Sequence, residues 1–212
     1  MGYFLPRLIL LISFIDLFFH FTTIARFAEL LQSSSYMIGV IVAIYSISNF
    51  AGNLISGIIL DRWGRITPVK FGLFFSSITV GSYYFVNSSI QLFVLRLLHG
   101  VGSSVLVPGA YAMLGDILKN RNHGRVMGIT GGIIAFSAIL GSLAAGLISE
   151  FISVRSVFMI DSILLFFCFI FLLIYSNKVS QSDTIDSGRE FFSKSNNSLL
   201  DALGNKLIIS YT

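Results

Sequence analysis

The chain has 212 residues, of which 55% are hydrophobic and only 11% are charged, with a formal net charge of +4. Soluble domains average about 25% charged residues because their surface must meet water. This composition, with a mean hydropathy of +0.85, excludes a soluble enzyme, a nucleic-acid-binding domain and a disordered protein, and it indicates an integral membrane protein in contact with lipid.

Six apolar runs follow one another, at about residues 4–24, 37–60, 69–86, 90–114, 126–149 and 156–175. Each approaches the roughly 20 residues that cross a membrane as a helix, and none alternates as a barrel strand does. The first run carries Asp16 and His20 and lacks a small-residue cleavage site, so it is a retained span rather than a signal peptide. We therefore expect an all-α membrane protein with six transmembrane helices.

The lysines and arginines predict the orientation of these spans, because cytoplasmic loops carry an excess of both. With a cytoplasmic N-terminus, the outer loops hold only Arg26 and Arg155, and Arg96 lies within a span. The cytoplasmic segments then hold Arg7, Arg62, Arg65, Lys70, Lys119, Arg121, Arg125, Lys178, Arg189, Lys194 and Lys206. This bias predicts a multi-pass protein of the cell membrane with its N-terminus in the cytoplasm.

Composition divides the chain into three parts. Residues 1–176 hold the predicted six-helix bundle, and residues 177–206 are rich in charge, serine and asparagine, as a cytosolic central loop would be. Residues 207–212 are apolar again and resemble the start of an incomplete seventh span.

An internal repeat is suggested by an offset of 89 residues between the second and fifth spans. It aligns Gly39 with Gly128, Gly52 with Gly141, Gly57 with Gly146, and Asp61 with Glu150. Three spans separate the two units, so they would face opposite sides of the membrane, and inverted three-helix repeats are a transporter architecture. Chance alignment of glycine-rich helices is the alternative.

Three motifs carry a family resemblance. Residues 57–65, Gly-Ile-Ile-Leu-Asp-Arg-Trp-Gly-Arg, resemble the loop signature between helices 2 and 3 of the major facilitator superfamily, with Ile66 in place of its final basic residue. Residues 96–102 resemble the R-x-x-q-G-x-G motif of helix 4, with His99 in place of glutamine, and residues 124–128 resemble the entry to helix 5. The resemblance implies the N-terminal six-helix half of a twelve-helix transporter, whose C-terminal half is missing from this chain.

The resemblance also implies a conformational latch in the first of these motifs. In the family, this loop contacts a helix of the second half and holds the cytoplasmic side closed. The positions carried over are Gly57, Asp61, Arg62, Gly64 and Arg65. The alternative is a positively charged turn that merely caps its helix.

Charged residues inside spans are costly and need a partner or water. Asp16, His20 and Arg96 fall in one outer slab of the membrane, where they form a candidate site for a proton or a substrate charge. The alternative is a static Asp16–Arg96 pair. Asp161 lies in the sixth span, which is usually scaffold in the family, and is interpreted as structural.

Glycines at spans four and five predict close helix packing: Gly100, Gly102, Gly141 and Gly146. A polar stripe in the second span is expected to join helices or to line a water path: Tyr45, Ser48, Asn49, Gly52, Asn53 and Ser56. His99 is interpreted as a packing residue beside Gly100. Three scattered histidines and the single Cys168 predict no metal site, and no cofactor motif is present.

The predicted function is therefore secondary transport by alternating access, namely proton-coupled efflux of small apolar or drug-like molecules. Residues 141–146 lack the Gly-Pro that antiporters of the family usually carry, which keeps a proton-coupled symporter of a small metabolite as the alternative. A non-transporting fragment or scaffold is a third hypothesis. An enzyme is not expected, since Ser56-Gly57 lacks the first glycine of an intramembrane protease motif, and a P-loop is absent.

Overall fold

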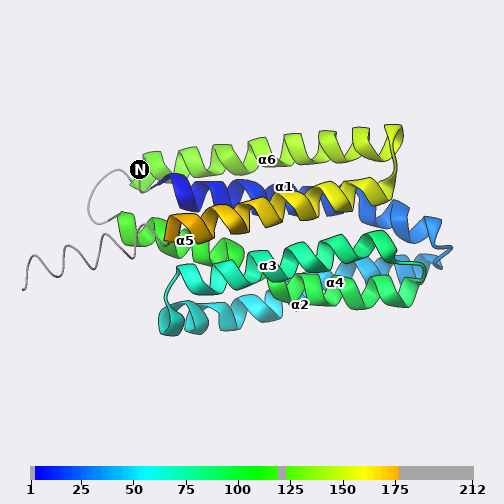
Figure 1. The fold of residues 1–212 in the computed structure, drawn as a ribbon, viewed down its shortest axis with the longest axis horizontal. Helices are drawn as coiled ribbons and strands as arrows, with labels where there is room; N and C mark the ends of the chain where they lie inside the picture. The colour runs from blue at the N-terminus through cyan, green and yellow to red at the C-terminus, as the bar shows by residue number, and fades with distance from the viewer. Residues whose placement is uncertain (1–2, 119–122, 177–212) are drawn as a thin grey trace, which may run out of the picture. The chain divides into compact units, whose positions relative to one another are not determined.

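The computed structural model describes residues 3–118 and 123–176, and every regular element in these ranges is helical. The predicted central loop and seventh span, residues 177–206 and 207–212, lie outside them. The chain divides into two compact units, Met1–Leu172 and Leu173–Thr212. The helices in chain order are α1 (Phe4–Leu30), α2 (Ser35–Trp63), α3 (Ile66–Ser82), η1 (Tyr83–Phe85), α4 (Ser89–Ser103), α5 (Leu106–Ile117) and α6 (His123–Phe151) (Figure 1). A last helix covers Val154–Ser176.

Five helices in the described ranges are long and apolar enough to cross a membrane: α1, α2, the α4–α5 segment, α6 and the last helix. The remaining predicted span corresponds to α3, which has 17 residues and continues into the 3-10 turn η1. The described part of this membrane protein is thus all-helical, with five candidate spans. α3 is shorter than the roughly 20 residues of a usual span.

The fourth predicted span, residues 90–114, is interrupted rather than continuous. α4 ends at Ser103 and α5 begins at Leu106. Pro108 has no N–H to offer the carbonyl of Ser104, four residues earlier, and its ring crowds that carbonyl. The Ser104 hydroxyl also donates to the carbonyl of Val101 at 2.7 Å, a bond that competes with regular helix.

Local sequence signals account for several helix ends. The hydroxyl of Ser34 accepts a hydrogen bond from the N–H of Met37 at the start of α2, and Ser88 does the same for Gln91 at the start of α4. α2 stops before Gly64, whose φ of +78° lies in the region that favours glycine.

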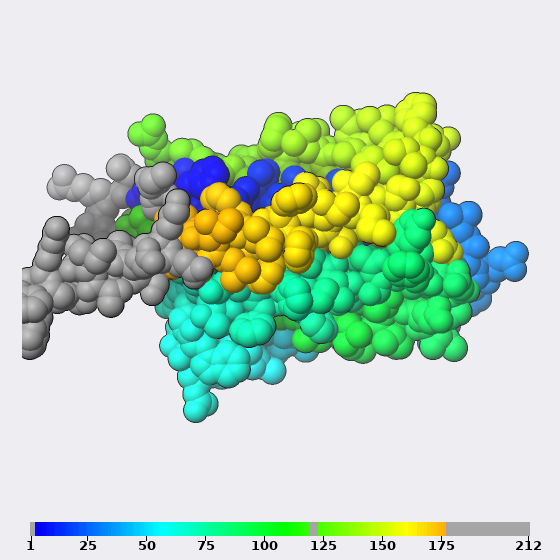
Figure 2. Space-filling view, viewed as in Figure 1, coloured from blue at the N-terminus to red at the C-terminus, as the bar shows by residue number. Residues whose placement is uncertain are grey.

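Packing within Met1–Leu172 pairs α1 with α6 and α2 with α4 most extensively. The last helix lies beside α3, where the Ser162 hydroxyl donates to the carbonyl of Ser77 at 2.7 Å (Figure 2). The four predicted packing glycines differ. A β-carbon on Gly100 would lie 2.6 Å from the Tyr45 carbonyl, and one on Gly141 would lie 3.2 Å from the Ile15 carbonyl. A β-carbon on Gly102 would lie 2.6 Å from the Phe75 ring, whereas Gly146 has nothing within 4 Å.

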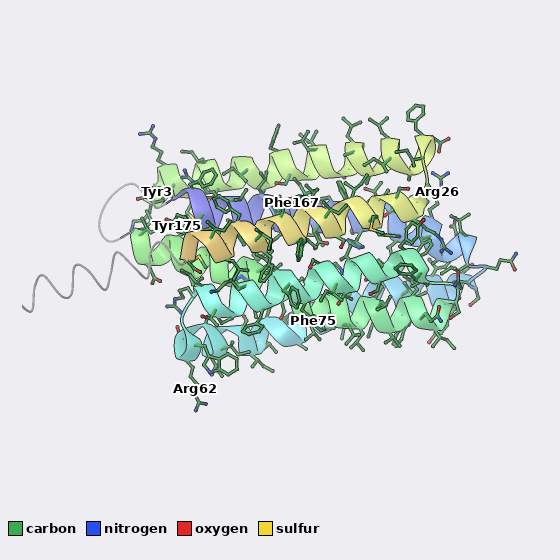
Figure 3. All side chains as sticks on the ribbon, in the orientation of Figure 1. Tyr3, Arg26, Arg62, Phe75, Phe167 and Tyr175 are labelled. Carbon is green, nitrogen blue, oxygen red and sulfur yellow. The ribbon has the colours of Figure 1, made fainter. Side chains whose placement is uncertain are left out.

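Large apolar side chains cover the outside of the helices, as a lipid-facing surface requires. Phe75 and Phe167 are exposed members of this surface (Figure 3). Tyr3 and Arg62 lie at one end of the bundle, and Arg26 lies at the other.

Candidate functional site

Seven polar side chains meet in the interior of the bundle, and we refer to them as the buried polar cluster. All are less than 9% exposed, and they come from α1, α2, η1, α4 and the last helix. The members are Asp16, His20, Tyr45, Tyr83, Arg96, His99 and Asp161. Burying charged and polar groups inside a membrane protein costs free energy, so a cluster of them indicates a functional site.

Asp16 and His20 lie one turn apart on α1, as their spacing predicts. His20 Nδ1 lies 2.9 Å from the main-chain oxygen of Asp16 and 3.2 Å from its carboxylate Oδ1. Because a carbonyl only accepts hydrogen bonds, Nδ1 carries the hydrogen. Asp16 is 1% exposed, so its carboxylate is shielded from bulk water.

His99 belongs to this cluster as well as to the helix packing that its neighbour Gly100 predicts. Its Nε2 lies 3.3 Å from Asp16 Oδ1, and its ring centroid lies 4.8 Å from that of His20. The rings of Tyr45 and Tyr83 lie 5.1 Å and 6.1 Å from the His99 ring. Sequence reasoning missed this role, because residue spacing does not show which face of α4 turns toward α1.

Asp161 is the second unexpected member. Its Oδ2 lies 3.5 Å from His20 Nδ1, so this nitrogen faces both carboxylates of the cluster. The ring of Phe158, one turn earlier on the last helix, stacks on the His20 ring at 5.3 Å. An acidic residue inside an apolar run is a functional candidate by default, and this was the available signal.

Arg96 does not form the static pair with Asp16 that the sequence left open. Its guanidinium carbon lies 4.4 Å from the centroid of the Tyr45 ring, a cation–π contact. In the described part of the chain, neither Asp16 nor Asp161 approaches an Arg96 nitrogen within ion-pair distance. The cluster therefore holds two carboxylates and one guanidinium without direct neutralisation.

Several polar atoms of the cluster have no hydrogen-bond partner among the described residues. Buried polar atoms are nearly always paired, so unpaired ones call for water, a proton or a ligand. They are Asp16 Oδ1, His20 Nε2, the Tyr83 hydroxyl, Arg96 Nε and Nη1, both His99 nitrogens and both Asp161 oxygens.

The ligand atoms of Asp16, His20 and His99 lie within 4.8 Å of one another, a spacing that a metal ion would also require. The sequence did not anticipate this proximity. His20 Nδ1, the nitrogen that faces the other groups, has the Asp16 carbonyl at 2.9 Å and carries a hydrogen, so it has no free lone pair for a metal. We therefore interpret the three residues as a hydrogen-bonded group.

A small polar cavity of about 80 Å³ reaches Asp16 from α2 and α4. It is lined in part by Asp16, Tyr45, Asn49, Asn53 and Ser103. The polar stripe of α2 thus borders the cavity and also joins helices, since the Asn49 amide donates to Ser103 Oγ at 3.0 Å. A cavity of this size has room for water beside the Asp16 carboxylate.

The loop between α2 and α3 carries a charge network at one end of the bundle. Arg65 Nη1 donates to Asp61 Oδ1, and its Nε donates to Asp116 Oδ2 at the end of α5, at 3.3 Å. The bonds to Asp61 and then to Asp116 raise the pKa of Arg65 above its ordinary value. Sequence reasoning missed Asp116, which nothing in the loop motif points to.

The other latch positions leave this end of α2 open. Arg62 is exposed, and Gly57 has nothing within 4 Å of where a β-carbon would lie. At the opposite end of the bundle, Arg26 Nη1 donates to Glu150 Oε2 at 3.2 Å.

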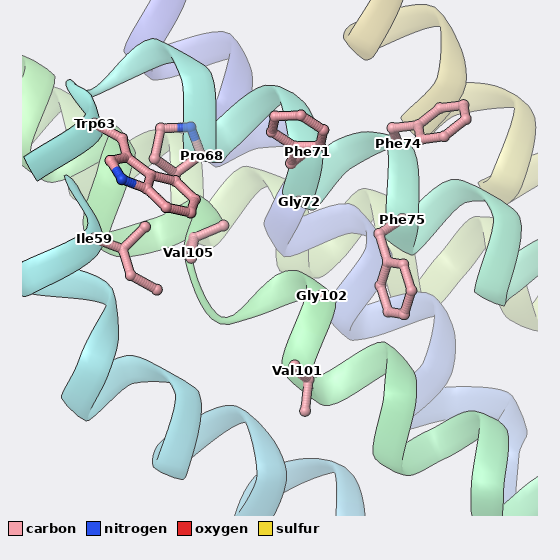
Figure 4. A pocket seen from close by; sticks show the side chains of 10 residues that line it. All are labelled: Ile59, Trp63, Pro68, Phe71, Gly72, Phe74, Phe75, Val101, Gly102 and Val105. Atoms are coloured by element: carbon pink, nitrogen blue, oxygen red, sulfur yellow. The ribbon is translucent and has the colours of Figure 1, made fainter.

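An apolar groove of about 530 Å³ lies between α2, α3 and the α4–α5 break, and none of its lining residues belongs to the buried polar cluster or to the Arg65 charge network (Figure 4). Trp63, Phe71 and Phe75 project around it. Its floor is deep because Gly72 and Gly102 bring α3 and α4 together: a β-carbon on Gly72 would lie 2.9 Å from the Gly102 carbonyl. The groove carries no charged side chain.

Comparisons with known proteins place these features in a family context. A family model described as the Major Facilitator Superfamily matches residues 8–211. Multidrug resistance protein 3 of Bacillus subtilis is 30% identical over 121 residues, 57% of this chain and 24% of the relative. Multi-drug resistance efflux pump PmrA of Streptococcus pneumoniae serotype 4 is 29% identical over 136 residues, 64% of this chain and 34% of the relative. Chromaffin granule amine transporter of Rattus norvegicus is 28% identical over 133 residues, 62% of this chain and 26% of the relative. The matches thus span about a quarter to a third of these relatives.

Proposed function

Because this chain belongs to the Major Facilitator Superfamily, and is a transporter-family protein rather than an enzyme, we propose that it forms the N-terminal half of a secondary transporter. The transporter works by alternating access and exports small apolar or drug-like molecules in exchange for protons. The buried polar cluster is the observation that carries the coupling part of this proposal.

The need for a second half is supported by the surfaces of α2 and α6. These are the least buried of the five candidate spans. Glycines with nothing within 4 Å lie along both helices, which leaves room for another helix to approach closely. They are Gly39 and Gly57 on α2, and Gly124, Gly128, Gly131, Gly132 and Gly146 on α6. A missing six-helix partner would cover this surface.

The inverted repeat is supported by the equal lengths of its two matched helices and by the similar packing of their aligned glycines. α2 and α6 both have 29 residues. Gly52 and Gly141 both lie against a neighbouring helix, whereas the other aligned glycine pairs are both open. The α1–α6 and α2–α4 pairings are also those that a repeat of three spans would exchange.

Proton coupling is supported by Asp16, His20 and Arg96. A carboxylate and an imidazole in contact, beside a polar cavity, are groups that can take up and release a proton. Arg96, held on the Tyr45 ring, supplies a positive charge that favours release.

Efflux of apolar or drug-like molecules is supported by the relatives, two of which are named as multidrug resistance or efflux proteins. The apolar, phenylalanine-rich helices suit the same class of substrate. We place the N-terminus in the cytoplasm, since Tyr3 and Arg62 lie at one end and Arg26 at the other. The protein then lies in the cell membrane, and the Asp61–Arg65 loop latches the cytoplasmic side.

The test is transport in proteoliposomes with an imposed pH gradient. The 212-residue chain is reconstituted alone, and together with the part of the pneumococcal efflux pump that follows its matched segment. We expect a lipophilic fluorescent dye to accumulate only with both parts, and a protonophore to abolish accumulation. Accumulation by the isolated chain would contradict the assignment as a half, and protonophore-resistant accumulation would contradict proton coupling.

A further inference from the structure

The inference concerns Asp161, a buried carboxyl group for which the proposed mechanism so far has no use. It is 0% exposed, and neither of its oxygens has a hydrogen-bond partner among the described residues. An ionised carboxylate at such a position would be shielded from bulk water, and His20 Nδ1 would lie 3.5 Å from it, which is a costly way to bury this group.

The neighbouring donors are already directed elsewhere. The hydrogen on His20 Nδ1 lies closest to the main-chain oxygen of Asp16, at 2.9 Å, and Asp16 Oδ1 follows at 3.2 Å. Asp161 Oδ2 is the most distant of the three oxygens, at 3.5 Å. Asp16 also has His99 Nε2 at 3.3 Å, so the contacts that stabilise an anion are more numerous and shorter at Asp16 than at Asp161.

The charge balance of the cluster also indicates that one of its two carboxyl groups is protonated. Besides Asp161 and Asp16, the titratable and charged groups of the cluster are His20 on α1, Tyr45 on α2, Tyr83 on η1, and Arg96 and His99 on α4. With neutral histidines and tyrosines, two ionised carboxylates against one guanidinium would leave an uncompensated negative charge inside the membrane. One additional proton removes it.

We propose that Asp161 holds this proton while Asp16 is ionised, and that the proton passes between the two carboxyl groups. Asp161 is then the second protonatable group of the coupling site. On exchange, the O–H bond at Asp161 breaks, an O–H bond forms at Asp16, and the negative charge moves to Asp161. Asp16 borders the polar cavity and passes the proton to water there. The coupling role rests on the transport function proposed above, whereas the presence of the proton does not.

The proton is tested in the 212-residue chain itself, in lipid nanodiscs, without any transport. Infrared difference spectra over a pH titration report the C=O stretch of a protonated carboxyl group. We expect such a band at neutral pH, its loss in Asp161→Asn, and its retention in Glu150→Gln, whose side chain is 68% exposed. In Asp16→Asn the band should disappear at a lower pH, because the neighbouring negative charge is gone.

A second measurement avoids dependence on the folding of a variant. Carbon-13 spectra of the unmutated chain with labelled aspartate should contain one carboxyl resonance in the protonated range at neutral pH. If all aspartates are ionised at neutral pH, or if the infrared band persists in folded Asp161→Asn, the proposal is overturned.

The coupling role is tested in the reconstituted transporter. Asp161→Asn should abolish the dependence of the initial dye uptake rate on pH, and Glu150→Gln should retain it. A normal pH profile in Asp161→Asn would remove Asp161 from coupling. If even the unmutated protein fails to transport, the proposed function fails, and the spectroscopic result still decides whether Asp161 holds a proton.

Discussion

Substitution of Gly100 by alanine tests how tightly α2 and α4 are held together. The added β-carbon would lie 2.6 Å from the Tyr45 carbonyl oxygen and 3.1 Å from the Asn49 nitrogen, and it would also overlap the Ser48 hydroxyl. Two of these atoms belong to the main chain, so a change of rotamer cannot relieve the contact. Ordinary contacts begin at 3.4 Å, so the helices must separate by about 0.8 Å in a tightly packed interior.

The expected cost follows from this separation. Overpacking of this kind costs about 1–3 kcal/mol, and the higher helix propensity of alanine offsets about 1 kcal/mol of this. The separation also strains the bond from the Asn49 amide to the Gly100 carbonyl, now 3.3 Å. We therefore expect a net destabilisation of the bundle of up to about 2 kcal/mol.

The assay is thermal unfolding of the purified chain in detergent, followed by circular dichroism. The matched control is Gly39→Ala in α2, because Gly39 has nothing within 4 Å. We expect Gly100→Ala to lower the Tm and Gly39→Ala to leave it unchanged or raise it. Equal Tm values for the two variants would refute the packing argument, because only one of them introduces a contact.

Three further predictions concern charge. Asp61→Asn in the reconstituted two-part transporter should impair transport while membrane insertion stays normal; unimpaired transport would remove Asp61 from the latch. Because Asp61 and then Asp116 raise the pKa of Arg65, its stabilising charge is complete below its unfolded pKa and is lost only as the pH rises through the still higher folded pKa. The Tm difference between the unmutated chain and Arg65→Gln should therefore stay constant from about pH 6 to pH 9 and shrink with added salt; a decline over this pH range would contradict the assignment. Asp16→Asn should flatten the pH dependence of dye transport, and an unchanged profile would exclude Asp16 from proton coupling.

The sequence predicted the local features of this chain well. The apolar runs form helices because lipid offers no hydrogen-bond partners, and only a helix pairs the main-chain N–H and C=O groups within one segment. The loop at residues 61–65 follows from its charges and from Gly64, whose positive φ few other residues adopt. The break before α5 was missed, although Pro108 was a visible signal for it.

The membership of the buried polar cluster was only partly predictable. Asp16 and His20 share one helix face, so their contact follows from the helical repeat. A static pair of Arg96 with Asp16 was the alternative that the sequence left open, and Arg96 instead lies on the Tyr45 ring. Asp161 and His99, interpreted as scaffold and packing, both contact the α1 pair.

The amino-acid sequence by itself determined the helical class, the family and the charged loop, because each depends on residues close together in the chain. The tertiary structure decided which charges meet, which glycines are crowded, and that Arg65 joins Asp116 to Asp61. The physical reason is that these helices are apolar on nearly every side. Hydrophobic periodicity then cannot show which face of a helix turns inward, and only packing against neighbouring helices sets its rotation.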